Sequence, residues 1–212
     1  MHPIISRFEN IKSLINNSNV KIIAVSKTFS YDEISPLCDY GHLHFGESKV
    51  QEAHSKWAEI KKKKPEINLH MIGKLQSNKA KEAIKLFDYI HSLDNQKLAN
   101  NLAKHESLSN KKLKYFIQVN IGNEKQKSGI RIELLDDFYY YCTKELNINI
   151  IGLMAIPPNN ENADNYFKKL MELNKLLNLK ELSMGMSSDF KLALNYETTF
   201  VRIGSSIFGT RS

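Results

Sequence analysis

Short apolar runs alternate with longer amphipathic stretches along the whole chain. The clearest run, 20–25 (VKIIAV), is rich in β-branched residues and too brief for a helix, so it predicts a strand that is buried on both faces. Similar runs recur to the end of the chain. They give eight candidate strands: 20–25, 43–45, 69–72, 89–91, 113–119, 148–153, 182–184 and 200–203.

Most stretches between these runs carry apolar residues at the i, i+3, i+4, i+7 spacing of an amphipathic helix. Such stripes begin at Val50, Ala80, Leu134 and Ala163, and another precedes the first strand, over 4–15. A repeating strand–helix order favours a parallel sheet with helices outside. We therefore predict an α/β fold, a single-domain modified TIM (β/α)8 barrel over residues 1–212 with an extra N-terminal helix. An open doubly wound sheet is the alternative.

The composition fits a globular intracellular protein. Hydrophobic residues make up 42% of the chain, no apolar run is long enough to cross a membrane, and residues 1–10 do not resemble a signal peptide. Cys38 and Cys142 lie far apart in no metal-binding spacing, and we expect reduced thiols. These features predict a cytoplasmic protein without a membrane partner.

The net charge of +7 raises the question of a nucleic-acid partner. The lysines are, however, spread along the chain. The one dense run, 61–64, falls at a predicted helix end, where lysines complement the helix dipole and face water. We expect no nucleic-acid partner.

In a parallel α/β barrel the active site lies at the C-terminal ends of the strands. The first strand is followed by Ser26, Lys27 and Thr28, so the Lys27 side chain is expected at the barrel mouth. Partial removal from water disfavours a charged ammonium group, and the free amine can then attack an aldehyde to form an imine. The alternative is an ordinary surface lysine whose stem lies along apolar neighbours.

Two turns of small residues follow the seventh and eighth strands, at 185–189 (GMSSD) and 204–209 (GSSIFG). Glycine lets the backbone approach a ligand closely, and the loops after these two barrel strands commonly hold phosphate. Capping of helices by Ser187 and Ser205 is the alternative, because capping and phosphate binding use the same geometry. Ser30 has no capping role that we identify in the sequence.

Arg202 lies inside the last strand. A charged residue is seldom buried without a partner, so an arginine that faces the barrel interior would be a functional candidate. An outward arginine paired with a helix is the alternative. His44, His70 and His91 fall in or beside different strands, but no metal-ligand spacing is present. We interpret them as core or supporting histidines and expect no metal site.

Several motifs in order resemble one protein family. The strings are AVSKT at 24–28, HFGES at 44–48, KVQE at 49–52, IGKLQSNK at 72–79, HSLD at 91–94, QVNIGNEKQKSG at 118–129, GLMAIP at 152–157, LSMGMSSD at 182–189 and VRIGSSIFG at 201–209. They resemble the YggS/PROSC family of homeostasis proteins that bind pyridoxal 5′-phosphate (PLP). The resemblance implies a modified TIM barrel like the N-terminal domain of alanine racemase, with PLP as its cofactor.

The resemblance also implies cofactor-binding roles for individual residues. Lys27 would hold PLP as a Schiff base, Ser187, Gly204 and Ser205 would bind the phosphate, Arg202 would face the pyridine nitrogen, and Met154 would lie near the cofactor. An arginine at that nitrogen keeps it unprotonated and makes the ring a poorer electron sink. One position departs from the family pattern, because Ser48 stands where the family usually has Asn. Serine is shorter, so the contact there would be lost or bridged by water.

The resemblance implies a protein of intracellular PLP homeostasis with no catalytic residue assigned. The alternatives are a PLP-dependent enzyme of racemase or decarboxylase type and, outside the family, a Schiff-base aldolase. Racemases of this barrel type use a second base from a further β-rich domain, for which we expect no room after residue 212. We therefore expect PLP and PLP-requiring apo-enzymes as partners, and a monomer.

Overall fold

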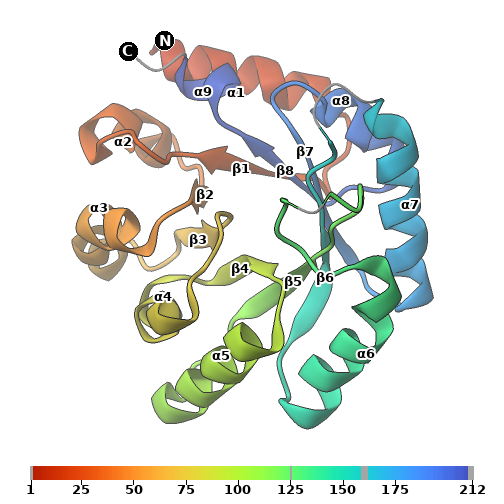
Figure 1. The fold of residues 1–212 in the computed structure, drawn as a ribbon. Coiled ribbons are helices and arrows are strands. Elements are labelled where there is room, and N and C mark those ends of the chain that lie inside the picture. Colours follow the sequence, from red (N-terminus) through yellow and green to blue (C-terminus); the bar gives the residue numbers. More distant parts are fainter. Residues whose placement is uncertain (1, 125, 159–161, 210–212) are drawn as a thin grey trace.

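Eight parallel strands form a closed barrel in sequence order, and β1 pairs with β8 to complete it (Figure 1). The computed structural model describes residues 2–124, 126–158 and 162–209, so residue 125 of the motif at 118–129 lies outside it. The strands are β1 (Lys21–Val25), β2 (His44–Glu47), β3 (Asn68–Met71), β4 (Tyr89–Leu93), β5 (Lys114–Gln118), β6 (Ile150–Met154), β7 (Glu181–Met186) and β8 (Phe200–Ile203). The predicted barrel is confirmed, and the open sheet is excluded.

Helices surround the barrel as an outer ring, and α1 is the extra element before the first strand (Figure 1). They are α1 (Pro3–Leu14), α2 (Tyr31–Asp39), α3 (Val50–Lys63), α4 (Ala80–Leu86), α5 (Gln96–Ser109), α6 (Leu135–Tyr140), α7 (Ala163–Leu176), α8 (Phe190–Ala193) and α9 (Ser205–Phe208). Short 3₁₀ turns, η1 (Ser77–Lys79), η2 (Ile132–Leu134) and η4 (Leu194–Tyr196), and one π-helical segment, η3 (Tyr141–Glu145), adjoin them. The predicted N-terminal helix is confirmed.

The strand register brings the ends of β1, β2 and β8 together. Val25 pairs with Gly46 of β2, and Ala24 pairs with Ile203 of β8. Every strand pair is parallel, so all the carboxyl ends lie at the same end of the barrel. Residues that follow these strands therefore meet around one mouth.

Ser30 caps α2, contrary to expectation. Its hydroxyl accepts a hydrogen bond from the backbone N–H of Glu33, and the Glu33 carboxylate accepts one from the Ser30 N–H at 2.7 Å. This is the reciprocal capping box of an S-x-x-E sequence. The expectation that Ser30 has no capping role is wrong because its partner lies three residues further along the chain.

Two separate sets of buried side chains stabilise the barrel. The larger set packs the strands against the helices, is almost entirely apolar, and includes Phe45, Trp57 and Phe167 with no exposed surface. We call it the outer layer. The smaller set fills the barrel interior with Ile23, Tyr89, Phe116, Met154 and Phe200.

Imidazole rings share the barrel interior with this smaller set. The His70 ring stacks on Tyr89 at 4.2 Å between centroids, and the His91 ring stacks on Phe116 at 4.3 Å. Both histidines have no exposed surface. His44 lies within 5.2 Å of His70, ring to ring, and is half-buried. His70 and His91 are therefore core histidines, and the half-buried His44 supports His70 at the edge of the interior.

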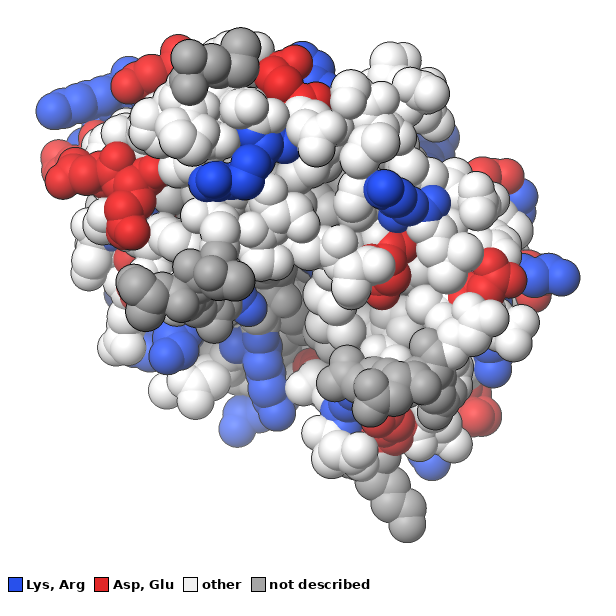
Figure 2. All heavy atoms as spheres, turned by 90° about the horizontal axis from the view of Figure 1, so that it is seen from above, with Lys and Arg blue, Asp and Glu red and all other residues white. Residues whose placement is uncertain are grey.

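Charged side chains of both signs are interspersed over the face drawn in Figure 2, where Lys and Arg form no continuous patch. The run 61–64 ends α3 as predicted, but Lys61 and Lys64 pair with Asp88 and Asp39 rather than simply facing water. No helix in the described part of the chain is long and apolar enough to span a membrane. Cys38 and Cys142 are free and buried, and burial raises the pKa of each thiol to about 12.

Candidate cofactor site

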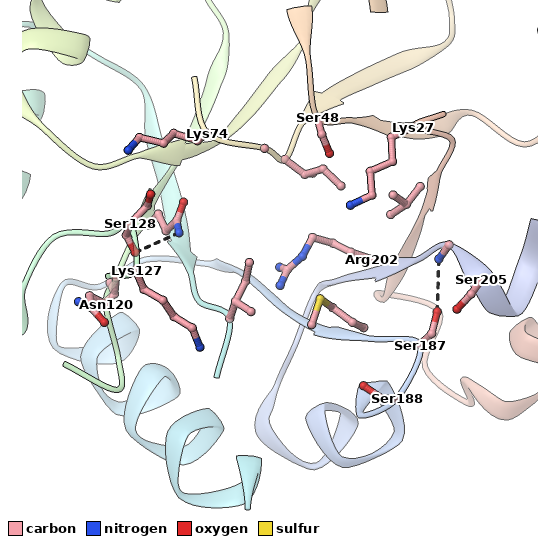
Figure 3. A pocket seen from close by; sticks show the side chains of 18 of the residues that line it. Lys27, Ser48, Lys74, Asn120, Lys127, Ser128, Ser187, Ser188, Arg202 and Ser205 are labelled. Atoms are coloured by element: carbon pink, nitrogen blue, oxygen red, sulfur yellow. Dashed lines mark hydrogen bonds between the residues drawn. The ribbon is translucent and has the colours of Figure 1, made fainter. Parts of the chain in front are cut away.

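A cavity of about 920 Å³ opens at the carboxyl ends of the strands (Figure 3). Residues at or after the ends of β1, β2, β3, β5, β6, β7 and β8 build its wall. Its described lining residues are Val25, Lys27, Phe29, Ser48, Ile72, Gly73, Lys74, Gln118, Val119, Asn120, Gln126, Lys127, Ser128, Ile156, Met186, Ser187, Ser188, Arg202, Gly204, Ser205 and Gly209. Six of the seven predicted site residues are among them.

Lys27 directly follows β1, and its half-buried side chain points into the cavity (Figure 3). Within the described residues its amine has no hydrogen bond and no ion pair, so it is available to a ligand. The strand-end position predicted for this lysine is confirmed. An amine that projects into a cavity differs from the alternative of a stem lying along the outer surface.

The residue after Lys27 has an unusual backbone conformation. Thr28 has a φ of 71°, in the left-handed region that a β-branched residue rarely adopts. Its N–H donates a hydrogen bond to Glu52 Oε1 on α3, and that carboxylate also lies 3.6 Å from Lys56 Nζ. The contact fixes the direction in which the chain leaves Lys27.

A buried carboxylate, Glu47, supports the ends of β1 and β2. Glu47 has no exposed surface, and its Oε1 accepts hydrogen bonds from Ser26 Oγ at 2.7 Å, Lys56 Nζ at 2.9 Å and Trp57 Nε1 at 2.9 Å. Lys56 also donates to the Ser26 carbonyl at 2.7 Å. A buried carboxylate needs such donors. The cluster therefore ties the peptide next to Lys27 to α3.

The two small-residue turns meet at one side of the cavity. Ser187 Oγ accepts a hydrogen bond from the Gly204 N–H at 3.4 Å, drawn as a dashed line in Figure 3. Neither Ser187 nor Ser205 is a helix N-cap, because Asp189 precedes α8 and Gly204 precedes α9. The capping alternative is therefore excluded. Ser205 is exposed, and its hydroxyl has no partner among the described residues.

Arg202 reaches the cavity from within the barrel. Its Nη1 donates to the carbonyl and to Oγ of Ser183 at 2.8 and 2.7 Å, and its Nη2 donates to the Ala155 carbonyl at 3.0 Å. Of the five N–H groups of a guanidinium, the Nε–H and one Nη2–H are left without a partner in the described part of the chain. Burial lowers the pKa of Arg202 to about 10, so the group stays charged at neutral pH. Arg202 faces inward, and the outward alternative is excluded.

The remaining two predicted residues differ in position. Ser48 lines the cavity near Lys27, and its hydroxyl has no partner among the described residues (Figure 3). Met154 is not among the described lining residues, because it is fully buried in the barrel interior beside Phe116 and Phe200. The structure therefore brings Ser48, and not Met154, to the space that a ligand can enter.

The loop after β5 supplies the wall across from Lys27, and the sequence analysis assigned it no role (Figure 3). Asn120, Lys127 and Ser128 lie there. Lys127 Nζ pairs with Glu124 at 2.5 Å and donates to the Pro157 carbonyl at 3.2 Å. The KSG string at 127–129 was the available sequence signal, but its spacing does not reveal that this loop folds over the barrel mouth.

The closed barrel, with a lysine at the end of its first strand, defines a protein of the alanine racemase N-terminal type. The family model described as alanine racemase, N-terminal domain, matches residues 3–212. The structure of PipY from Synechococcus elongatus with PLP bound superposes with a TM-score of 0.89 and 34% identity, covering 97% of this chain and 100% of that one. An alanine racemase from Clostridium difficile, 14% identical, has a TM-score of 0.79 over 100% of this chain and 57% of its own, which is a likeness of fold.

Relatives with a common name identify the family within this class. The pyridoxal phosphate homeostasis protein of Aquifex aeolicus is 37% identical over 200 residues, 90% of this chain and 87% of the relative. The protein of the same name from Escherichia coli is 32% identical over 201 residues, with shares of 91% and 86%. The chain belongs to the family of pyridoxal phosphate homeostasis proteins.

Proposed function

We propose that this protein binds PLP as a Schiff base on Lys27 and serves PLP homeostasis. The observation that carries the proposal is a single cavity in which a lysine amine without a protein partner, a buried arginine and two serine-bearing turns surround one space. Family membership supports it, since PipY, at 34% identity, has a structure with PLP bound.

The charge of the cavity suits an anionic ligand. Its described lining residues include the cations Lys27, Lys74, Lys127 and Arg202 and no carboxylate. Lys127 shares its charge with Glu124, and the other three have no carboxylate within ion-pair distance among the described residues. A concave site lined by one sign of charge attracts ligands of the opposite sign, such as an organic phosphate. The residues present therefore fit PLP.

Each wall of the cavity offers one kind of contact to such a ligand. PLP, when bound, supplies an aldehyde and an electron-accepting ring. Lys27 Nζ would be the nucleophile toward that aldehyde, in a condensation whose leaving group is water. The hydroxyls of Ser187 and Ser205 would donate hydrogen bonds to the phosphate, and the Gly204 N–H would donate to it in place of its present bond to Ser187 Oγ. Arg202 would donate one of its two remaining N–H groups to the pyridine nitrogen.

Two contributions are less direct. Ser48, one short hydroxyl, would reach the cofactor itself or through a water molecule. Met154 would act from beneath the floor of the cavity, through the interior packing below Arg202. Both roles are part of the same proposal.

The cavity favours retention of PLP over turnover. Apart from the amines of its lysines, its described lining residues offer no carboxylate, imidazole, phenol or thiol that could transfer a proton beside PLP. An arginine at the ring nitrogen also weakens the ring as an electron sink. We therefore propose a carrier rather than a racemase or decarboxylase. A single domain, a cytoplasmic location, a monomeric state and delivery to apo-enzymes belong to this proposal.

Covalent labelling tests the proposal. The protein is incubated with PLP at neutral pH, its absorption spectrum is recorded, and the complex is reduced with borohydride and digested for mass spectrometry. We expect a Schiff-base absorption band and a pyridoxyl label on Lys27. Lys27→Ala should lose both signals, because the other two described lysines of the cavity, Lys74 and Lys127, lie away from Lys27 (Figure 3). Lys49→Ala, at an exposed lysine before α3, is the matched control and should keep both. An unchanged band in Lys27→Ala would contradict the proposal.

A further inference from the structure

A continuous chain of hydrogen bonds starts at Arg202 and crosses the barrel interior. Arg202 Nη1 lies 2.7 Å from Ser183 Oγ, which lies 2.9 Å from His91 Nδ1. His91 Nε2 lies 2.9 Å from His70 Nδ1, and His70 Nε2 lies 2.9 Å from His44 Nδ1. These five residues belong to β8, β7, β4, β3 and β2, so the chain links one side of the barrel to the other.

The direction of this chain follows from its first member. A guanidinium can only donate, so Ser183 Oγ accepts from Arg202 and keeps its own proton to donate. The one other partner of that hydroxyl among the described residues is His91 Nδ1. His91 therefore accepts at Nδ1 and carries its proton on Nε2, which donates to His70. His70 in turn donates from Nε2 to His44.

The imidazoles are neutral at neutral pH, as this chain requires. Burial, and then the positive charge of Arg202, lower the pKa of His91 far below its ordinary value. Burial and the neighbouring histidines lower the pKa of His70 in the same direction. Burial, Lys21 and Lys114 lower the pKa of His44 to about 4. A neutral imidazole has one donor and one acceptor nitrogen, so each ring can continue the chain without a break.

We propose that Ser183, His91, His70 and His44 are positioning residues. Their directional chain of hydrogen bonds fixes the Arg202 guanidinium at the cavity floor, and this position determines how well Arg202 donates a hydrogen bond to a ligand with an aromatic ring nitrogen. This inference rests on the proposed function for the identity of the ligand. The chain itself is a property of the protein alone and can be tested without any ligand.

The geometry explains how an effect reaches Arg202. Two of its three hydrogen bonds end on Ser183, one at the carbonyl and one at the hydroxyl. The hydroxyl is held in an accepting orientation only while His91 takes its proton. If the chain is interrupted, the hydroxyl can rotate, and the guanidinium loses one of the contacts that fix its plane. Its free N–H groups would then meet a ring nitrogen less well.

The first experiment examines the tautomers of the unliganded protein by NMR with ¹⁵N-labelled histidine. We expect His91, His70 and His44 to be neutral, each with its proton on Nε2. Ser183→Ala should shift the His91 Nδ1 resonance, since that nitrogen loses its donor. Ser92→Ala is the matched control, because Ser92 is 2% exposed, adjoins His91 in sequence, and its hydroxyl has no partner among the described residues. Protons on Nδ1, or an unchanged His91 in Ser183→Ala, would overturn the chain.

The second experiment measures PLP binding by the same variants. We expect Ser183→Ala to weaken PLP about tenfold and to move its absorption maximum, the effect of one hydrogen bond of about 1.4 kcal/mol. Ser92→Ala should match the parent protein. Parent-like binding by Ser183→Ala would overturn the positioning role even if the tautomers are as expected. Failure of the parent to take up PLP would overturn the proposed function and the ligand part of this inference, while the NMR result still decides the chain.

A variant at His44, the other end of the hydrogen-bond chain, tests the proposal even if the protein does not fold with a substitution at Ser183. His44 is half-buried, so His44→Phe should fold while leaving the His70 Nε2–H without an acceptor. We expect the His70 resonances to shift and PLP to bind about threefold more weakly, a smaller effect because the break is further from Arg202. His44→Asn restores an acceptor near the Nδ1 position and should recover most of both. Equal behaviour of the two His44 variants would contradict the proposal.

Discussion

The outer layer and the barrel interior are both buried, yet different physical requirements specify them. In the outer layer, side chains such as Trp57, Phe87 and Phe167 pack strands against helices, and nearly every contact is apolar. In the interior, Tyr89, Phe116 and Phe200 alternate with imidazoles and a guanidinium that need particular partners.

This difference determines which properties of a side chain affect stability in each region. Apolar contacts are not directional, so the outer layer responds mainly to the volume and shape of a side chain. The interior chain from Arg202 to His44 is directional, so it responds to which atom donates and which accepts. A substitution that keeps volume should be mild in the first region and harmful in the second.

The largest effect is expected from a cavity in the outer layer. Phe167→Ala removes a fully buried ring from α7 and should lower the free energy of unfolding by about 3–5 kcal/mol. Phe167→Leu keeps most of the volume and should cost less than about 1.5 kcal/mol. Urea unfolding at neutral pH measures both. Equal losses for the two variants would mean that the outer layer does not respond to volume as argued.

A smaller effect is expected from a change of nearly constant shape in the interior. Ser183→Ala removes one oxygen and leaves His91 Nδ1 and one Arg202 N–H without their partner, so it should cost about 1–3 kcal/mol. Ser92→Ala makes the same chemical change where no hydrogen bond exists, and it should be neutral or slightly stabilising. Urea unfolding of the pair is the measurement. A loss in Ser92→Ala as large as in Ser183→Ala would remove the distinction.

The smallest effect concerns pH. The pKa of His70 in the folded protein is well below the ordinary value of 6.5, so below that pH the unfolded chain binds the proton that the folded chain excludes. Stability should therefore fall as pH decreases from 6.5, and each such histidine contributes about 1.4 kcal/mol per pH unit. His70→Phe should have a shallower loss between pH 6.5 and 5 than the parent, while His54→Asn, at an exposed position, should not. Parallel curves for His70→Phe and the parent would contradict this account.

The apolar pattern was sufficient to predict the eight strands, because a strand buried on both faces requires a continuous apolar run. It also placed Lys27 at a strand end and Arg202 within the last strand. The direction in which Arg202 points was left open, and its inward orientation follows only from its contacts with Ser183 and Ala155. The pattern could not reveal the chain through His91 and Ser183, which pair across 92 residues of sequence. It also missed the cluster at Glu47, whose partners become neighbours only when α3 packs on β2.

Expectations for single residues failed where the role of a residue depends on a hydrogen-bond partner or on its height within the barrel. Ser30 caps α2 because Glu33 completes the capping box. Met154 faces the barrel interior, but it packs there with Phe116 and Phe200 and therefore lies below the space that a ligand can enter. Neither fact depends on the residue alone.

The left-handed backbone of Thr28 has a consequence for the free energy of ligand binding. A β-branched residue held at φ 71° costs about 1–3 kcal/mol of folding free energy, and the hydrogen bond to Glu52 helps to offset it. Because this conformation is fixed, the main chain at Lys27 loses little conformational entropy when a ligand binds. Such preorganisation lowers the entropic cost of forming the complex. The main chain at Lys27 is therefore already ordered before a ligand binds, and only the four-carbon side chain has to adopt the bound conformation.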